Sequence, residues 1–250
     1  MRILLTGHKG FIGSTLLKAL KLTHTVTGID LQDGVNLLTY NFPEEFDLVI
    51  HLAGKSGVRE SLLDPGAYWM NNVEASRRLF NRYPNTRILY ASSSSAYEPD
   101  LNPYAASKYM LEELAVRHDN ALGMRFHTVY SNTPRKNMFF DKLFNNKLEY
   151  TTTHYRDFVH LHDVIEAINI LIHHTHIKGV LDIGSGVPVR IQDFAPNLPV
   201  RLNTPGERQW TCANIEKIKA LGYKPKYMIK EFLTNKELGT IIKLNTGEIA

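Results

Sequence analysis

The sequence predicts an α/β fold in which helices cover both faces of a doubly wound parallel sheet, with a small lobe toward the C-terminus. Short apolar runs of strand length recur along the chain, and segments with helical periodicity lie between several of them. Hydrophobic residues make up 43% of the 250 residues, enough to bury a full core. This alternation of strands and helices is typical of βαβ units, which build parallel sheets.

Five buried strands are expected in the first half of the chain, at 2–6, 25–30, 47–53, 87–92 and 121–126. Helical periodicity marks three segments between them, at 11–21, 67–82 and 104–117. The stretch between Asp30 and Asp47 is too short for a whole helix and a strand. A short third strand is therefore predicted at GVNLL, residues 34–38, with little or no helix before it.

The second half continues with fewer strands. Helices are expected at 139–146 and 162–174, a strand at 179–185, and two further helices at 214–221 and 229–238. Residues 1–127, completed by about 156–183, are predicted to form the sheet domain. Residues 128–155 and 184–250 are predicted to form a small substrate-binding lobe.

The charge pattern argues against nucleic acid as a partner. A net charge of +4 comes from 29 basic and 25 acidic residues scattered along the chain, whereas nucleic-acid-binding domains concentrate Lys and Arg on one face. A mild positive excess suits small anionic ligands. His173, His174 and His176 bunch at a predicted helix end, where they suit the helix C-terminus, and no metal is predicted.

The first residues run from an apolar strand directly into glycines, without a leader-like segment. The longest apolar run, around AINILI, is too short to cross a bilayer. The single cysteine, Cys212, excludes an internal disulfide and suits a reducing compartment. We therefore expect a cytoplasmic protein with no membrane partner.

Three glycines, Gly7, Gly10 and Gly13, lie between the first strand and the first helix in LLTGHKGFIGSTLL. Glycines there permit a tight turn and close approach of the backbone to a pyrophosphate, which the helix N-terminus also attracts. Asp30 ends the second strand, where a carboxylate can bind a ribose diol and would repel a 2′-phosphate. The alternative for Asp30 is an ordinary solvated acid. The sequence predicts a Rossmann-type domain that binds NAD rather than NADP.

The stretch ASSSSAYEPDLNPYAASK contains a second candidate constellation. Tyr104 and Lys108 are four residues apart and so share one face of the helix that begins near Pro103. A free tyrosine is a poor base at neutral pH, and a nearby ammonium favours its phenolate. A serine hydroxyl from the preceding strand end could bind the same substrate oxygen. Downstream of a dinucleotide turn, this spacing predicts a proton-transfer site.

With these motifs in order, the chain resembles the extended short-chain dehydrogenase/reductases, the class of nucleotide-sugar epimerases and dehydratases. The resemblance covers nearly the whole chain, through TGHKGFIGS, HLAGKSGVRES, NNVEASRRLF, YASSSSAY, YAASK, RFHTVYS, RDFVHLHDV and LDIGSG. GVRESLLDPGAY and RFHTVYSNTPRKNM are most similar to UDP-glucuronate 4-epimerases.

The resemblance implies a catalytic trio of Ser93, Tyr104 and Lys108. Tyr104 would take the proton of the sugar 4-hydroxyl while hydride leaves C4. The 4-keto sugar would then rotate to present its opposite face before the hydride and the proton are returned. Dehydratases of the class carry an acidic pair after the serine, and decarboxylases a nearby glutamate. Ser94 and Ser95 stand there instead, which favours epimerisation.

The resemblance also assigns binding residues. Those for NAD are Gly7, Gly10, Phe11, Ile12, Gly13, Asp30, Leu52, Ala53, Gly54, Asn72, Tyr104 and Lys108. Those for the UDP-sugar are Ser93, Ser94, Thr128, Arg135, Arg156 and Arg208. Arg135 is expected to pair with the glucuronate carboxylate and Arg156 with the diphosphate, because a guanidinium binds such anions bidentately.

The chain departs from the family pattern in two places. Six residues, Glu98 to Pro103, replace a considerably longer connection before Tyr104, although they can still join a strand end to a helix start. Asn203 and Thr204 stand where relatives often carry a uridine-side arginine. A UDP-glucose 4-epimerase, a 4-keto-sugar reductase and a catalytically idle NAD-binding relative therefore remain alternatives. From the resemblance, a homodimer is expected through helices 67–82 and 104–117.

Overall fold

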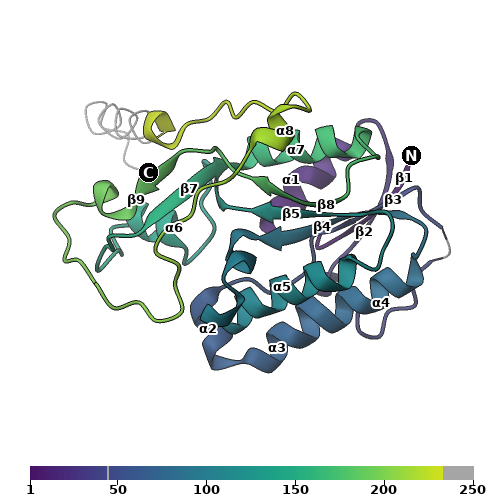
Figure 1. The fold of residues 1–250 in the computed structure, drawn as a ribbon, viewed down its shortest axis with the longest axis horizontal. Coiled ribbons are helices and arrows are strands. Elements are labelled where there is room, and N and C mark those ends of the chain that lie inside the picture. Colours follow the sequence, from purple (N-terminus) through teal and green to yellow (C-terminus); the bar gives the residue numbers. More distant parts are fainter. Residues whose placement is uncertain (44, 233–250) are drawn as a thin grey trace.

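The computed structural model describes residues 1–43 and 45–232, which form two sheets (Figure 1). The larger sheet has six parallel strands in the order β2-β1-β3-β4-β5-β8. All six are predicted by the sequence, with ends that differ by at most two residues. They are β1 (Arg2–Thr6), β2 (Thr25–Ile29), β3 (Leu48–His51), β4 (Arg87–Ser93), β5 (Ala121–Phe126) and β8 (Gly179–Ile183).

Helices cover both faces of this sheet (Figure 1). One face carries α1 (Phe11–Leu20) and α7 (Leu161–His173), with the short α8 (Glu216–Lys219) beside β8. The other carries α4 (Ala75–Arg82) and α5 (Pro103–Ala115), and α2 (Val58–Leu63) and α3 (Pro65–Trp69) pack against α5. The doubly wound arrangement is confirmed.

Side-chain alternation along the strands builds a separate apolar core on each face. Ile3 and Leu5 of β1 pack with α1 and α7, whereas Leu4 packs with α4 and α5. Both cores consist largely of fully buried aliphatic side chains. This packing fixes the carboxyl ends of the strands, the edge at which sheets of this kind bind ligands.

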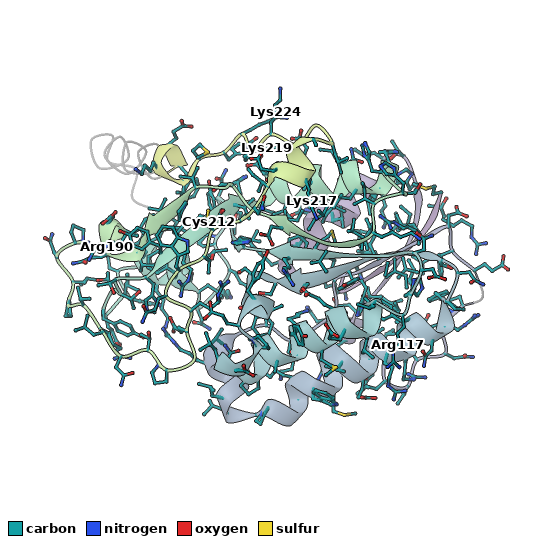
Figure 2. All side chains as sticks on the ribbon, in the orientation of Figure 1. Arg117, Arg190, Cys212, Lys217, Lys219 and Lys224 are labelled. Carbon is teal, nitrogen blue, oxygen red and sulfur yellow. The ribbon has the colours of Figure 1, made fainter. Side chains whose placement is uncertain are left out.

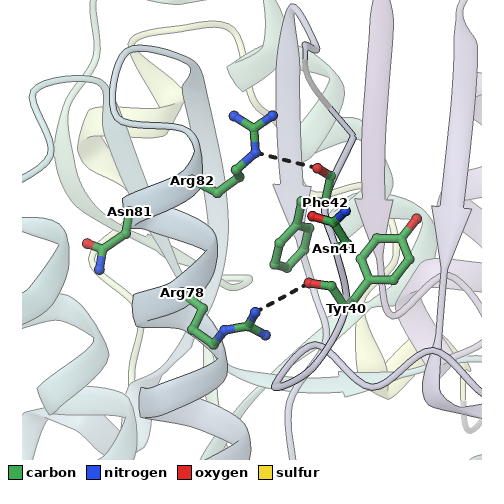
Figure 3. A pocket seen from close by; sticks show the side chains of 6 residues that line it. All are labelled: Tyr40, Asn41, Phe42, Arg78, Asn81 and Arg82. Carbon is green, nitrogen blue, oxygen red and sulfur yellow. Dashed lines mark hydrogen bonds between the residues drawn. The ribbon is translucent and has the colours of Figure 1, made fainter.

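The third strand predicted at 34–38 is wrong. The place beside β1 is taken by β3, in the register Ile3 to Leu48, and residues 34–40 form turns instead. Guanidinium groups of α4 bind backbone carbonyls of this segment and of the residues that follow it (Figure 3). Arg78 donates to the Tyr40 carbonyl at 3.4 Å and also to that of Leu37, and Arg82 donates to the Phe42 carbonyl at 3.4 Å. A cavity of about 330 Å³ lies between these segments.

The helix predicted at 67–82 has three parts. Asp64 caps α3 by accepting a hydrogen bond from the Ala67 N–H at 3.1 Å. A π-helical turn, η2 (Met70–Glu74), follows α3 and leads directly into α4. Such a wide turn inserts an extra residue into the helix, and functional side chains often lie there. Here it carries the buried Asn72.

The second sheet has the order β6-β7-β9, with β6 (Thr128–Tyr130) parallel and β9 (Pro188–Arg190) antiparallel to β7 (Tyr155–His160). Helix α6 (Phe139–Phe144) packs over it through an aromatic cluster, as expected for a helix-period core. The helix predicted at 229–238 lies mostly outside the described residues. Among the helices of residues 1–43 and 45–232, none is long and apolar enough to cross a membrane.

Candidate active site

The glycine turn is pressed against the end of β3. Gly7 has a φ of +73°, and a Cβ at this position would lie 2.6 Å from the Ala53 nitrogen and 2.9 Å from the Leu52 carbonyl carbon. A Cβ on Gly13 would overlap the Gly7 carbonyl oxygen. Both positions therefore require glycine, because any side chain would push the turn, β3 and α1 apart.

The turn presents the N-terminus of α1 to the carboxyl edge of the sheet. Gly10 is its N-cap and places no capping side chain over the first turn. The N–H groups of Phe11, Ile12 and Gly13 are the first of the helix and lack partners within it. Free N–H groups and the helix dipole together favour a phosphate. A crowded glycine turn beneath an uncapped helix start fits the pyrophosphate of a dinucleotide.

Asp30 lies at the end of β2 and is buried. Its carboxylate accepts hydrogen bonds from the Lys9 N–H at 3.0 Å and the Gln32 N–H at 2.9 Å. These bonds fix the carboxylate against the glycine turn, and each oxygen keeps a lone pair for a further donor. This position suits recognition of a ribose diol, and that role of Asp30 stays a prediction.

Asn72 connects the cofactor side of the site to α5. Its side chain accepts from the Lys55 N–H at 2.7 Å and donates to the Lys55 carbonyl at 3.0 Å. It also donates to the Ser107 hydroxyl at 2.9 Å. A Cβ on Gly54 would lie 2.8 Å from the Asn72 Oδ1 and 3.4 Å from the Lys108 Nζ. The segment after β3 and the start of α5 are thus held at one place.

His51 supports this arrangement from below and is fully buried. Its ring nitrogens are hydrogen-bonded to the hydroxyls of Thr6 at 2.7 Å and Ser76 at 2.8 Å. Burial, with a smaller effect from Lys108, lowers the pKa of His51 to about 3. The neutral ring ties β1 and β3 to α4 and is a poor candidate for proton transfer at physiological pH.

Ser93 and Tyr104 meet as the sequence predicts. Ser93 ends β4, and its hydroxyl accepts from the Ser95 N–H at 3.1 Å. Burial raises the pKa of the Tyr104 phenol, while a hydrogen bond with Ser93 and the charge of Arg135 lower it. The Tyr104 ring also packs edge-on against Tyr68. The pKa of Tyr104 thus depends on burial, on a strand-end hydroxyl and on a guanidinium.

Lys108 lies one helical turn beyond Tyr104 and is buried. Its ammonium donates to the Ala91 carbonyl at 2.8 Å. Burial lowers the pKa of Lys108 to about 8, against the opposing effect of Glu112. The sequence predicts that Lys108 lowers the pKa of Tyr104. In the structure burial raises the pKa of Tyr104 on balance, Ser93 and Arg135 oppose that rise, and the Lys108 ammonium bonds to β4 near Gly54.

The short connection before Tyr104 is built from two tight turns, η3 (Ser94–Tyr97) and η4 (Pro99–Leu101). Asn102 then caps α5 by accepting from the Ala105 N–H at 2.8 Å. The Asn102 amide also donates to the Gly206 carbonyl at 2.8 Å. Six residues thus suffice to bring Tyr104 back to the end of β4.

The arginines predicted to bind substrate approach the site from the second sheet. Arg135 is exposed and donates to the Ser56 hydroxyl at 2.9 Å, close enough to lower the pKa of Tyr104. Arg156 lies on β7, two residues before Phe158, and the two side chains therefore face the same side of the sheet. Thr128 of β6 is paired with Phe158, so its side chain faces that side as well.

Arg208 reaches the serine segment directly. It donates to the Ser94 carbonyl and to Glu98, both at 2.6 Å. Arg208 also contributes to the electrostatic surroundings of Arg156, whose pKa is lowered chiefly by burial. The structure therefore brings Arg208 into contact with Ser94, and it places Arg208 near enough to Arg156, and Arg135 near enough to Tyr104, for their charges to interact.

A buried polar network that sequence reasoning missed lies behind the serines. Ser92 donates to Glu112, which pairs with Arg125 through two hydrogen bonds of 2.8 and 2.5 Å. The Arg125 guanidinium lies 4.0 Å from the centre of the Tyr97 ring, and the Tyr97 hydroxyl donates to Asp182 at 3.0 Å. The one sequence signal was Glu112, four residues after Lys108 on the same helix face.

The described residues contain no cluster of three or more His, Cys, Asp or Glu side chains suited to a metal ion. Cys212 is exposed on the segment that leads to α8 (Figure 2). Partial screening of its thiol from water, with the charges of Asp157 and Asp182 nearby, raises the pKa of that thiol, which disfavours a nucleophilic thiolate.

Comparisons with known proteins agree with this geometry. The fold is similar to that of MoeE5 in complex with UDP-glucose and NAD, with a TM-score of 0.82 and 26% identity. The match covers 98% of this chain and 100% of the MoeE5 chain. UDP-glucuronic acid 4-epimerase from Bacillus cereus, in complex with UDP-glucuronic acid and NAD, matches with a TM-score of 0.82 and 25% identity, over 92% and 96% of the two chains.

Sequence comparison agrees. The uncharacterized UDP-glucose epimerase YtcB of Bacillus subtilis is 28% identical, over 99% of this chain and 100% of the relative. Residues 3–184 match the profile described as the NAD dependent epimerase/dehydratase family. The chain therefore belongs to the NAD-dependent epimerase/dehydratase family, with NAD as its cofactor.

Proposed function

We propose that this protein is an NAD-dependent nucleotide-sugar 4-epimerase that interconverts UDP-glucuronate and UDP-galacturonate. The observation that carries the proposal is the approach of an exposed guanidinium, Arg135, to the phenol of Tyr104, which is hydrogen-bonded to Ser93. A sugar oriented with its 4-hydroxyl at Tyr104 would have a cation within reach of a carboxylate on the neighbouring carbon.

The residues of this chain divide the work as follows. NAD, when bound, accepts and returns the hydride of C4. Tyr104 takes the proton of the 4-hydroxyl and gives it back, and Ser93 holds the same oxygen by a hydrogen bond. Lys108 supplies positive charge between β4 and Gly54, on the cofactor side. Arg156 and Arg208 hold the diphosphate, which leaves the sugar free to turn over.

The serine segment supports epimerisation over elimination of water. Ser94 and Ser95 offer no carboxyl group next to Ser93. The nearest acid along the segment is Glu98, and Arg208 holds its carboxylate. A 4-keto sugar in this site therefore lacks the carboxylic acid that would carry a proton to a departing hydroxyl.

A UDP-glucose 4-epimerase is the second candidate. It is supported by the relative named as a UDP-glucose epimerase and by the structural neighbour in complex with UDP-glucose. In that reading Arg135 is a loop residue that steadies Ser56. The two candidates differ in one measurable way, the dependence of substrate preference on Arg135.

The test is incubation of the purified full-length protein with UDP-glucuronate, without added NAD, followed by chromatographic detection of UDP-galacturonate. We expect conversion in both directions, and its loss in Tyr104→Phe with NAD binding retained. A 4-keto-sugar reductase would consume reduced cofactor in proportion to product. A protein that binds NAD but converts no UDP-sugar would contradict the proposal and would identify an idle relative.

We also propose that the protein forms a homodimer through the faces of α3 and α5 that look away from the sheet. Large apolar side chains are exposed on these helices, on α2 and on the adjoining turns, all of which pack against α5: Leu62, Leu63, Trp69, Met70, Leu101, Tyr109 and Val116. Exposed apolar side chains on neighbouring elements suit contact with a second copy of the chain. Helix α5 also carries Tyr104 and Lys108, and the η2 turn that follows α3 carries Asn72, so pairing would steady the site.

A further inference from the structure

Three side chains of α5, each four residues after the one before, bind three consecutive residues at the end of β4. The pairs are Tyr104 with Ser93, Lys108 with Ala91 and Glu112 with Ser92. Residues four apart lie on one face of a helix, so the three contacts form a single row between α5 and β4. The first two pairs belong to the candidate site, and Glu112 continues the row directly behind them.

The Glu112 carboxylate is buried and binds two strands at once. Besides the hydroxyl of Ser92 on β4, it accepts from the Arg125 Nε at 2.8 Å and from the Arg125 Nη2 at 2.5 Å. Arg125 is the residue of β5 that pairs with Ser92 in the sheet. The ring of Tyr97 lies 4.0 Å from the Arg125 guanidinium. Because the donors come from the strands and the acceptor from α5, Glu112 fixes the helix against the end of β4.

Glu112 also places a buried negative charge one helical turn from Lys108. The Lys108 ammonium is buried and has a neutral acceptor, the Ala91 carbonyl, at 2.8 Å. Burial lowers the pKa of Lys108 to about 8, and the charge of Glu112 opposes that fall. The carboxylate that holds the strand end is thus also a group that favours the charged form of Lys108.

The other titratable groups around this row keep one charge between about pH 6 and pH 9. His51 of β3, whose pKa is about 3, stays neutral. Arg125 stays positive, because its bonded carboxylate raises its already high pKa. The phenols stay neutral because burial raises the pKa of each: Tyr68, Tyr90, Tyr97 and Tyr104. Lys108 is therefore the member of this set that titrates in the range.

We propose that Glu112 is a positioning residue of the candidate site, which holds Ser93 opposite Tyr104 through Ser92 and keeps a negative charge beside the Lys108 ammonium. The inference rests on the proposed function for the parts that these side chains play in the reaction. Glu112 itself touches no reacting atom and acts through its neighbours. The strand-end hydroxyl and the ammonium of the site therefore depend on one carboxylate behind both.

The first measurement is the titration of Lys108 by nuclear magnetic resonance, in the full-length protein labelled with carbon-13 at its lysine side chains. The resonance that is missing in Lys108→Met identifies it, and its midpoint should be about 8. Glu112→Gln keeps the shape of the side chain and removes its charge, so the midpoint should fall by about one pH unit. Glu113→Gln, an exposed neighbour on α5, makes the same change in net charge and should leave the midpoint in place. An unchanged midpoint in Glu112→Gln would overturn the charge role.

The second measurement is steady-state kinetics on the UDP-sugar at about pH 6.5 and pH 8.5. Glu112→Gln should lower kcat about tenfold at the higher pH, where fewer molecules hold the ammonium, and by less than about threefold at the lower pH. Glu112→Asp keeps the charge and withdraws it from Ser92 by one methylene. It should leave the Lys108 midpoint near that of the wild type and lower kcat about tenfold at both pH values, with little change in KM.

The two variants separate the two effects, and each can fail alone. Wild-type kcat in Glu112→Asp would overturn the positioning of Ser93. The titration of Lys108 needs no turnover, so it also separates this inference from the proposed function. If Glu112→Gln lowers the Lys108 midpoint while the wild type converts no UDP-sugar, the proposed function fails and the effect of Glu112 on Lys108 stands.

Discussion

At the residue scale, the surroundings of Tyr104 explain why the site needs more than a tyrosine and a lysine. Burial makes the phenol harder to ionise, and Ser93 and Arg135 act against burial. Both groups also lie where substrate is expected, so a bound sugar would change the balance. The acidity of Tyr104 therefore depends on which ligand occupies the site.

Replacing Arg135 tests substrate choice. We expect Arg135→Ala to lower kcat/KM for UDP-glucuronate about 10- to 100-fold, the range for a lost hydrogen bond to a charged group, and to affect UDP-glucose far less. The measurement is steady-state kinetics on both substrates. Lys136→Ala, an exposed neighbour in the same loop, is the matched control. Equal losses on both substrates would mean that the carboxylate assignment is wrong.

The lowered pKa of Lys108 predicts a pH dependence of stability. Below about 8 both the folded and the unfolded protein hold the proton. Between a pKa of about 8 in the fold and its ordinary value of 10.5, the unfolded chain binds more protons, so the free energy of unfolding rises with pH in that window. The contribution is about 3 kcal/mol when complete.

Lys108→Met lacks this contribution. Denaturant unfolding of both proteins should be measured at pH 7.5 and at about pH 10. At the higher pH the free energy of unfolding of the wild type should have risen relative to that of Lys108→Met. The comparison cancels the titration of the tyrosines that both proteins share. Parallel changes with pH in the two proteins would contradict a buried, charged Lys108.

At the element scale, the connection between β4 and α5 shows how a short loop can preserve a site. Two tight turns cover the distance, and the cap at Asn102 begins α5 where Tyr104 faces Ser93. The same side chain binds the Gly206 carbonyl in the small lobe. One amide therefore sets both the start of the catalytic helix and the position of the turn that carries Arg208.

Asn102→Ala should lower the free energy of unfolding by about 1–2 kcal/mol through loss of the cap. It should also raise KM for UDP-sugars, because the turn with Arg208 loses its anchor. Asp64→Ala removes a comparable cap from α3 but leaves the hydrogen bond between Asn102 and Gly206 in place, and should cost stability with little change in KM. The readouts are chemical denaturation and kinetics. A similar KM in both variants would argue against the anchoring role.

Much of the fold and part of the site could be predicted from local patterns. Strand-length apolar runs and the spacing of the glycines from Gly7 to Gly13 predict local structure without knowledge of the tertiary fold. Tyr104 and Lys108 share a face of their helix however that helix packs. The strand expected at 34–38 is wrong because an apolar run does not reveal that Arg78 will bind the Leu37 carbonyl, or that β3 will take the place beside β1. The approach of Arg135 to Tyr104, and the bond from Tyr97 to Asp182, join residues far apart in the chain.

At the scale of the whole molecule, the candidate site is assembled from both sheets. The large sheet and α5 supply the glycine turn, Asp30 and the predicted trio of Ser93, Tyr104 and Lys108, and the second sheet with its loops supplies Arg135, Arg156 and Arg208. Hydrogen bonds join the two parts, among them Arg135 to Ser56 and Arg208 to Ser94. Because these contacts involve the proposed ligand-binding groups themselves, substrate should tighten the association of the lobe with the sheet.

The proposed dimer can be tested at this scale by light scattering with size exclusion. Trp69→Asp places a charge among the exposed apolar side chains of α2, α3 and α5 and should convert a dimer into a monomer. Trp210→Asp alters an equally exposed tryptophan of the small lobe, which is 52% exposed against 43% for Trp69, and should leave the dimer intact. A wild-type protein that elutes as a monomer would contradict the proposal.

The wide turn at Met70–Glu74 has a consequence for how this chain tolerates insertions and deletions. An extra residue in a helix rotates the side chains before it by about 100° around the helix axis, relative to the side chains after it. Removing one residue here would restore a uniform spiral, yet it would swing Asn72 away from Lys55 and Ser107. A lost codon in this stretch should therefore yield a well-folded protein whose nucleotide site has come apart.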